Sequence, residues 1–309
     1  MPYVKYEEIR LSAKSLALVK TCASIIDEYV AQGFTLTLRQ LYYQLVSRDV
    51  ISNRQQEYKR LGSIVNDARL AGLIDWEAIE DRTRNLRSLS HWASPSEIVQ
   101  TCAKQFWMDH WHGQPYRIEC WIEKDALVGV IEGVCNEFDV PFFSCRGYTS
   151  QSEMWGAAMR LKDYLHQGQM PVILHLGDHD PSGMDMTRDI RERLRLFTGQ
   201  DIEVRRLALN MDQIKRYNPP PNPTKLTDSR ATGYIQEFGN DSWELDALEP
   251  RVIAGLIREH ALRLLDSELW HATETKVSDG RKALADISRN WQRVIDLIGP
   301  RKPRRVNRK

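Results

Sequence analysis

The first part of the chain carries apolar residues at helical spacing. Apolar positions recur every three or four residues in three stretches, which predicts three amphipathic helices. These stretches are 14–31, 38–47 and 55–71. Thr37 stands where the second helix needs an N-cap, and Gly33 and Gly72 follow the first and third helices as stop signals.

The third predicted helix has a basic outer face. Its apolar residues Leu61, Val65 and Ala68 lie on one side, so the basic residues near it remain on the other. These basic residues are Arg54, Lys59, Arg60 and Arg69. With the segment 73–85 as a strand pair or wing, the pattern predicts a winged-helix domain that binds DNA. Three helices with a solvated basic face are also common without DNA binding, so the pattern alone leaves both interpretations open.

Beyond residue 115 the pattern changes to strands that alternate with helices. Apolar runs typical of buried strands lie at 116–122, 140–145, 171–176 and 202–209, with helical patterns at 126–138, 152–168 and 182–197 between them. This alternation predicts a parallel α/β sheet. Ser150 followed by Glu153 marks a helix start, and the region 249–297 is predicted to be largely helical. The expected fold class is therefore α/β, and α+β overall.

The change of pattern suggests four segments. We expect a winged-helix domain at 1–88, a linker at 89–115, a sheet domain with a helical C-terminal extension at 116–298 and a basic tail at 299–309. The net charge is only +1 although the last nine residues hold six basic side chains, so any affinity for nucleic acid must come from local patches. The tail is expected to be disordered, either contacting phosphates or simply solvated.

Composition excludes several other classes of protein. No apolar run approaches the roughly 18 residues of a membrane span, and the charged N-terminus does not suggest a secretory signal, so a cytoplasmic location is expected. The five cysteines are widely spaced without a CxxC pair, which suggests buried, reduced thiols. His110 and His112 have no further ligands at metal-binding spacing and are interpreted as structural or surface residues.

Three carboxylates follow predicted strands. Glu123 comes directly after the first strand of the sheet, and Asp178 and Asp180 come after the strand 171–176. In an open parallel sheet, ligands bind outside the carboxyl ends of the strands, so the three side chains are expected to converge there. Each one alone is better explained as a turn or helix-start carboxylate. Together they predict a site for a hard divalent cation, Mg2+ first, which can stabilise charge on a phosphodiester.

The motifs around these acids resemble a known family. The segments IEKDA (122–126), RGYTS (146–150) and LGDHDPSGMDM (176–186), with WELDAL (243–248) behind them, resemble the Toprim domain of the topoisomerase VI A-subunit family, which includes the meiotic proteins that make programmed double-strand breaks. The first and third segments match the family pattern closely. The loop at 147–150 reads Gly-Tyr-Thr-Ser where the family has a Gly-Tyr-Pro-Asp-like sequence, so its role is open.

The second predicted helix carries a candidate nucleophile. The run from Arg39 to Tyr43 resembles the family segment R-x-I-Y-Y, which implies that Tyr43 is the nucleophilic tyrosine. Tyr42 falls on the apolar stripe, whereas Tyr43 lies off it and is expected to reach solvent or DNA. Arg39 is four residues before Tyr43 on the same face, where it is expected to grip the attacked phosphate and to favour the phenolate.

The resemblance implies Mg2+-dependent DNA cleavage through a tyrosyl–DNA intermediate. It also implies a homodimer in which the tyrosine of one subunit meets the metal site of the other. Tyr43 comes early in the chain, so the N-terminal extension with which family members dock their ATPase subunit is expected to be missing or short. No P-loop motif is present, so resealing by strand passage would need a separate GHKL-type ATPase subunit. Two alternatives remain open: a Toprim nuclease that uses water as its nucleophile, and a DNA-binding module without catalysis.

Overall fold

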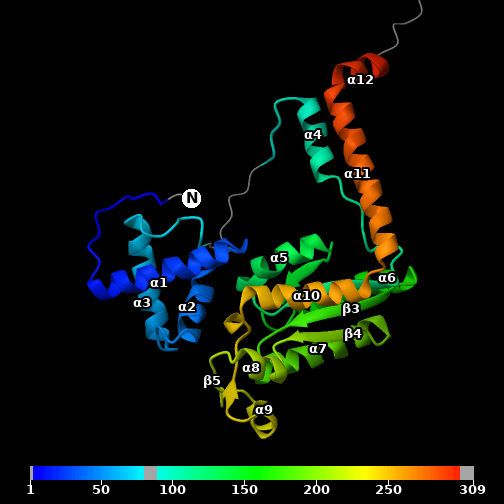
Figure 1. Cartoon of the computed structure of the whole chain (residues 1–309). Helices are drawn as coiled ribbons and strands as arrows, with labels where there is room; N and C mark the ends of the chain where they lie inside the picture. The colour runs from blue at the N-terminus through cyan, green and yellow to red at the C-terminus, as the bar shows by residue number, and fades with distance from the viewer. Residues whose placement is uncertain (1–2, 80–88, 300–309) are drawn as a thin grey trace, which may run out of the picture. The chain divides into compact units, whose positions relative to one another are not determined.

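The computed structural model describes residues 3–79 and 89–299 (Figure 1). The chain divides into two compact units, one made of residues 1–85 and 115–265 and the other of residues 86–114 and 266–309. Within the described residues it is a mixed α/β protein with twelve α-helices and a four-stranded parallel sheet. The coarse fold class predicted from the sequence is therefore confirmed.

The first unit begins with the three predicted helices. They are α1 (Ala13–Val30), α2 (Leu38–Ser47) and α3 (Gln55–Leu70). Thr37 caps α2 in a reciprocal capping box with Gln40, and Gly72 adopts a positive φ of 73° after α3, as a stop residue should. The apolar stripes of the helices form one core. Ile79 makes a parallel bridge with Leu36 and residues 73–78 form bends, so this part of the predicted wing is not a strand pair, whereas residues 80–85 lie outside the described residues.

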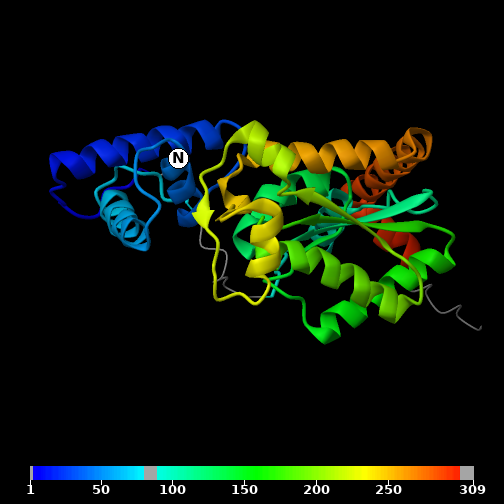
Figure 2. The same cartoon turned by 90° about the horizontal axis from the view of Figure 1, so that it is seen from below.

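The parallel sheet has the strand order β2-β1-β3-β4. Its strands are β1 (Tyr116–Ile122), β2 (Phe142–Ser144), β3 (Met170–Leu176) and β4 (Glu203–Ala208). The centre of β1 and β3 is fully buried because helices cover both faces. Figure 2 shows α10 (Pro250–Leu264) on one face and α6 (Gln151–His166) with α7 (Pro181–Thr198) on the other. This arrangement leaves the carboxyl ends of β1 and β3 side by side.

Shorter elements complete the first unit. They are η1 (Asp125–Leu127), α5 (Val128–Glu137), α8 (Met211–Tyr217), β5 (Asn222–Pro223), α9 (Ala231–Phe238), β6 (Asp241–Ser242) and η2 (Leu245–Ala247). The Pro-rich loop contributes β5, which pairs antiparallel with β6. The turn after β6 leads into η2, which packs against α2. This packing gives α2 neighbours more than 200 residues away in the sequence.

The second unit is helical. It contains α4 (Pro95–Gln105), which packs along α11 (Ser267–Arg289), and α12 (Trp291–Ile298). The segment 89–115, whose pattern is helical at first and then typical of a linker, holds α4. His110 stacks between Trp107 and Trp270, which agrees with its interpretation as a structural residue. The predicted basic tail lies almost entirely outside the described residues.

Two expectations from composition can be compared with the described residues. All five cysteines are free and four of them are buried, as the sequence suggested. No helix in the ranges 3–79 and 89–299 is both long and apolar enough to cross a membrane.

Candidate functional site

Two of the three predicted acids are in direct contact at the edge of the sheet. Glu123 follows β1 and Asp178 follows β3, its neighbour in the sheet, and the Asp178 N–H donates a hydrogen bond of 2.8 Å to Glu123 Oε2. Asp180 caps α7 by accepting 2.7 Å from the Gly183 N–H. Its charge is near enough to contribute to the pKa of Glu123. Glu123 and Asp178 thus meet at the sheet edge where the alternating pattern predicted, and Asp180 follows them at the start of α7.

Two glycines permit this close approach. A Cβ on Gly177 would lie 2.9 Å from Glu123 Oε2, and a Cβ on Gly183 would collide with the carbonyl of Asp178. Arg206 of β4 stabilises the same turn by donating hydrogen bonds of 2.9 Å to the Gly183 carbonyl and 3.1 Å to the Gly177 carbonyl. Burial lowers the pKa of this guanidinium to about 10. Glycine at 177 and 183 therefore leaves room for Glu123 and the Asp178 carbonyl, and Arg206 holds the turn by its hydrogen bonds to the main chain.

Lys124 lies among three carboxylates that the sequence did not group together. Its Nζ is 2.9 Å from Asp178 Oδ2, 2.8 Å from Glu244 Oε2 and 3.6 Å from Asp246 Oδ2. Asp178 Oδ1 also accepts 2.8 Å from the Leu245 N–H. Sequence reasoning missed Lys124, Glu244 and Asp246 as site residues. The signal was the lysine directly after Glu123 and two acids two positions apart in WELDAL.

Arg39 connects α2 to the same acids. Its Nη2 donates 2.7 Å to Glu244 Oε2, and its Nε donates 2.7 Å to Asp246 Oδ2. The guanidinium carbon also lies 5.7 Å from the centroid of the Tyr43 ring. Arg39 and Tyr43 therefore share a face, as predicted, while the guanidinium binds carboxylates in this structure.

The acids of the site have strongly different proton affinities. Burial, and then the nearby charge of Asp178, raises the pKa of Glu123 to about 7. Burial also raises the pKa of Asp178 to about 6, against the opposing effect of Lys124. Burial would raise the pKa of Glu244 as well, but Lys124 and Arg39 together lower it to about 2. The site thus combines one firmly ionised acid with two that hold a proton more readily.

One oxygen of the site is left without a partner. Asp246 Oδ1 is buried and accepts no hydrogen bond from any residue of the described ranges. A carboxylate oxygen in that position is costly unless it finds a donor or a cation. Carboxylate oxygens are also the ligands that Mg2+ prefers, so the donor set suits this ion. However, no group of three or more His, Cys, Asp or Glu side chains within 3–79 and 89–299 is already arranged as metal ligands.

The expectation that Tyr43 reaches solvent is wrong. Its side chain is only 7% exposed, because residues 244–247 cover this face of α2. Burial and then the charge of Glu244 raise the pKa of Tyr43, so the phenol is held neutral and the expected phenolate is not favoured in this state. Tyr42 is also buried, as predicted, and its hydroxyl donates 3.1 Å to Asn53 Oδ1.

Tyr43 nevertheless lines a cavity of about 480 Å³. Arg39, Asp180 and Glu244 of the same chain line it as well. The cavity thus brings the candidate nucleophile, one predicted metal ligand and one newly found acid into a single wall. In the structure these residues come together within one chain.

The four basic residues predicted to contact DNA differ in availability. Arg54 and Lys59 are exposed at the start of α3. Arg60 is paired with Glu57 at 2.6 Å. Arg69 donates 2.8 Å to the Trp76 carbonyl, so it stabilises the turn after α3. Only Arg54 and Lys59 are unengaged candidates for phosphate contacts.

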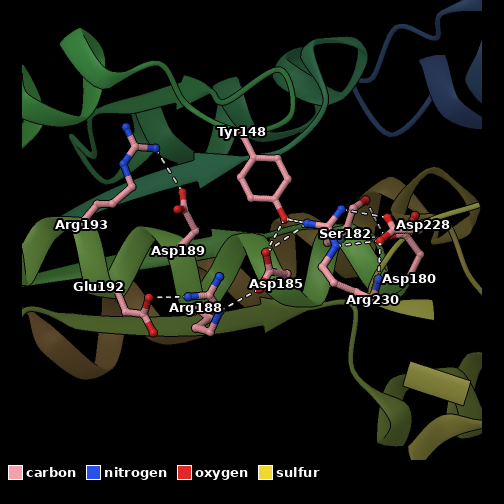
Figure 3. Close-up of polar contacts among 11 residues, drawn as sticks. Tyr148, Asp180, Ser182, Asp185, Arg188, Asp189, Glu192, Arg193, Asp228 and Arg230 are labelled. Carbon is pink, nitrogen blue, oxygen red and sulfur yellow. Dashed lines mark hydrogen bonds and ion pairs between the residues drawn. The ribbon is translucent and has the colours of Figure 1, made fainter. Parts of the chain in front are cut away.

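The loop whose sequence departs from the family pattern is tied to α7. Figure 3 shows the hydroxyl of Tyr148 between Asp185 and Arg230. Arg230 also pairs with Asp228 at 2.7 Å. Hydrogen bonds from Arg188 first, and then from Tyr148 and Arg230, lower the pKa of Asp185 to about 2. The loop 147–150 is therefore held against α7, the helix that Asp180 caps.

Comparisons with known proteins add no relative. No protein-family model matches the chain, and no curated protein matches it.

Proposed function

We propose that the protein cleaves DNA through a tyrosyl–DNA intermediate, in the manner of a topoisomerase VI A subunit. Its N-terminal helices would act as a winged helix and its sheet domain as a Toprim domain. The single observation that carries the proposal is the cavity lined by both Tyr43 and Asp180, which can bring a phosphodiester to a nucleophile and to a carboxylate site together. Double-stranded DNA is the substrate, and a homodimer and a separate GHKL-type ATPase remain proposed partners.

Mg2+ is the proposed cofactor. Glu123, Asp178 and Asp180 would hold it, because they are the carboxylates at the ends of β1 and β3. When bound, the ion would stabilise the charge on the attacked phosphodiester. Lys124 now supplies the cation that neutralises Asp178. Its release from Asp178 is therefore part of the proposal.

The residues on α2 would carry the covalent step. The Oη of Tyr43 forms a bond to phosphorus, the bond from phosphorus to the 3′ oxygen breaks, and the leaving 3′ oxygen takes up the proton that the phenol releases, so that it departs as a 3′ hydroxyl. Glu244 accepts a hydrogen bond from Tyr43 and so orients the phenol, while its pKa of about 2 makes it a weak base. The guanidinium carbon of Arg39 is 5.7 Å from the centroid of the Tyr43 ring. Once the guanidinium is released from Glu244 and Asp246, it binds the attacked phosphate.

The test is to trap the covalent intermediate. The protein is incubated with radiolabelled DNA and magnesium chloride, denatured, and analysed for protein that stays attached to 5′ DNA ends. Tyr43→Phe should abolish the adduct. Tyr6→Phe is the control, because it removes an exposed tyrosine hydroxyl that does not line the cavity and should leave the adduct in place. An adduct that persists in Tyr43→Phe rules out the assignment.

One observation favours a second candidate, a metal-dependent nuclease that uses water. The phenol of Tyr43 is buried and its pKa is raised, which suits a structural residue better than a nucleophile. In that case cleavage leaves free ends, survives Tyr43→Phe and is lost in Asp178→Ala. Absence of any cleavage, together with no magnesium binding by calorimetry, would instead leave a DNA-binding module.

A further inference from the structure

The cavity beside Tyr43 has the size of a site for one small ligand. Its volume of about 480 Å³ falls within the range of roughly 300–1,000 Å³ that small-molecule sites occupy. A base-paired duplex is far too large to enter such a space, whereas one nucleotide fits. A nucleoside that enters the cavity brings its own phosphate close to Tyr43.

One wall of the cavity is a connected set of aromatic rings. The rings of Tyr42 and Tyr43 meet edge to face with centroids 5.2 Å apart, and those of Tyr42 and Tyr58 meet in the same way at 5.3 Å. Trp243 lines the cavity as well. Tyr42 and Tyr43 are buried, and Tyr42 holds the ring of Tyr58 in place. The half-buried rings of Tyr58 and Trp243 are therefore the ones on which a planar base would stack.

Side-chain amides line the same cavity. Asn53, Gln55 and Asn222 each offer both a donor and an acceptor, which is what the hydrogen-bonding edge of a base requires. Asn53 is held in place by the Tyr42 hydroxyl and by Asn222. The Gln55 amide makes no hydrogen bond to any residue of the ranges 3–79 and 89–299, so it is available to a ligand.

Lys225 offers the cavity a cation for a phosphate. Lys225 is exposed at the cavity and pairs with no acid among the residues that the structure describes. Arg39 lies on the wall beside Tyr43. Asp180 and Glu244 line the cavity too, and Arg39 is already paired with Glu244. Lys225 is therefore the cation that a phosphate flanking a bound nucleotide would meet.

We propose that this cavity binds one unstacked nucleotide of the DNA, next to the phosphate that Tyr43 attacks. The inference rests on the proposed function and names its substrate class. Turning a base out of the helix costs a few kcal/mol and costs least where the base is unpaired. The preferred substrate is therefore DNA with a bulged, mismatched or single-stranded nucleotide at the cleavage position.

The test measures binding without cleavage. The Tyr43→Phe protein is titrated with matched DNA duplexes that carry 2-aminopurine either in a one-nucleotide bulge or fully paired. We expect about tenfold tighter binding of the bulged duplex, since stacking contributes about 1–3 kcal/mol per base. The fluorescence of the bulged reporter should also change when it stacks in the cavity. Equal affinity for the two duplexes, or an unchanged reporter, overturns the proposal.

Variants locate the effect. In the same background, Trp243→Ala and Gln55→Ala should each reduce the preference for the bulge, while Trp155→Ala, which removes an exposed indole from α6, should not. Gln55 is itself exposed, so its variant tests the site even if Trp243→Ala fails to fold. A preference that survives both cavity variants, or that Trp155→Ala removes equally, places the base elsewhere and rejects the proposal.

Two further outcomes separate this inference from the proposed function. A covalent adduct from the wild-type protein without any preference for the bulge removes the nucleotide site and leaves the cleavage proposal standing. Preference for the bulge without any adduct supports the nucleotide site and removes the cleavage proposal. A free deoxynucleoside monophosphate that competes as strongly as the bulged DNA would mean that the cavity binds a nucleotide effector, which also overturns the substrate inference.

Discussion

Replacing Lys124 by alanine should destabilise the protein and make its stability depend on magnesium. The Lys124 ammonium is only 16% exposed and has three carboxylates within 3.6 Å. Removing one partner from a buried ion pair costs about 3–5 kcal/mol. We expect the lower end, about 3 kcal/mol, because the remaining acids keep some partners. Glu244 and Asp246 keep Arg39, and Asp178 keeps the Leu245 N–H.

Magnesium should reverse much of this loss. In the wild-type protein an ion at Asp178 must displace Lys124, whereas in Lys124→Ala it meets an uncompensated cluster of acids and binds more tightly. Because a ligand that binds only the folded state stabilises it, the gain in unfolding free energy at a given magnesium concentration should be larger in the variant.

Urea unfolding with and without magnesium chloride measures both effects. Lys20→Ala is the control, since Lys20 is exposed on α1 and its loss should change the stability by less than about 0.5 kcal/mol. The interpretation of Lys124 as the internal counter-ion fails if Lys124→Ala costs no more than the control. It fails equally if magnesium stabilises the variant and the wild type by the same amount.

Two further predictions follow from the same residues. The pKa of Glu123 is raised to about 7 and that of Asp178 to about 6, so protons compete with the cation for these carboxylates in this pH range. Magnesium affinity measured by calorimetry should therefore fall as the pH is lowered from 7 to 6 and level off above pH 7. A pH-independent affinity between these values would place the ion elsewhere. Because Tyr43 and Asp180 of one chain line one cavity, an equal mixture of Tyr43→Phe and Asp178→Ala proteins should form no DNA adduct. If each site instead combined two subunits, random dimers would recover about a quarter of the wild-type sites, and such recovery in a gel assay would refute assembly within one chain.

Local features of this protein were readable from the sequence. The helical spacing predicted α1, α2 and α3 to within about a residue at each end, and the alternating pattern predicted the parallel sheet. These features depend on neighbours a few residues apart, such as Thr37 and Gln40 in the capping box of α2. The meeting of Glu123 and Asp178 was also predictable, because neighbouring parallel strands end at the same edge.

The tertiary structure alone decided the electrostatics of the site. Arg39 binds acids 205 and 207 residues away, and no local pattern specifies such a contact. The sequence does not predict that Lys124 forms ion pairs, because its partner Glu244 comes from the segment after β6, which only the fold brings next to β1. Tyr43 lies off the apolar stripe of its helix, yet it is buried because a distant segment covers it. Periodicity reports which face of an element is apolar, whereas ion pairing and the burial of a polar face depend on which distant segments pack against it.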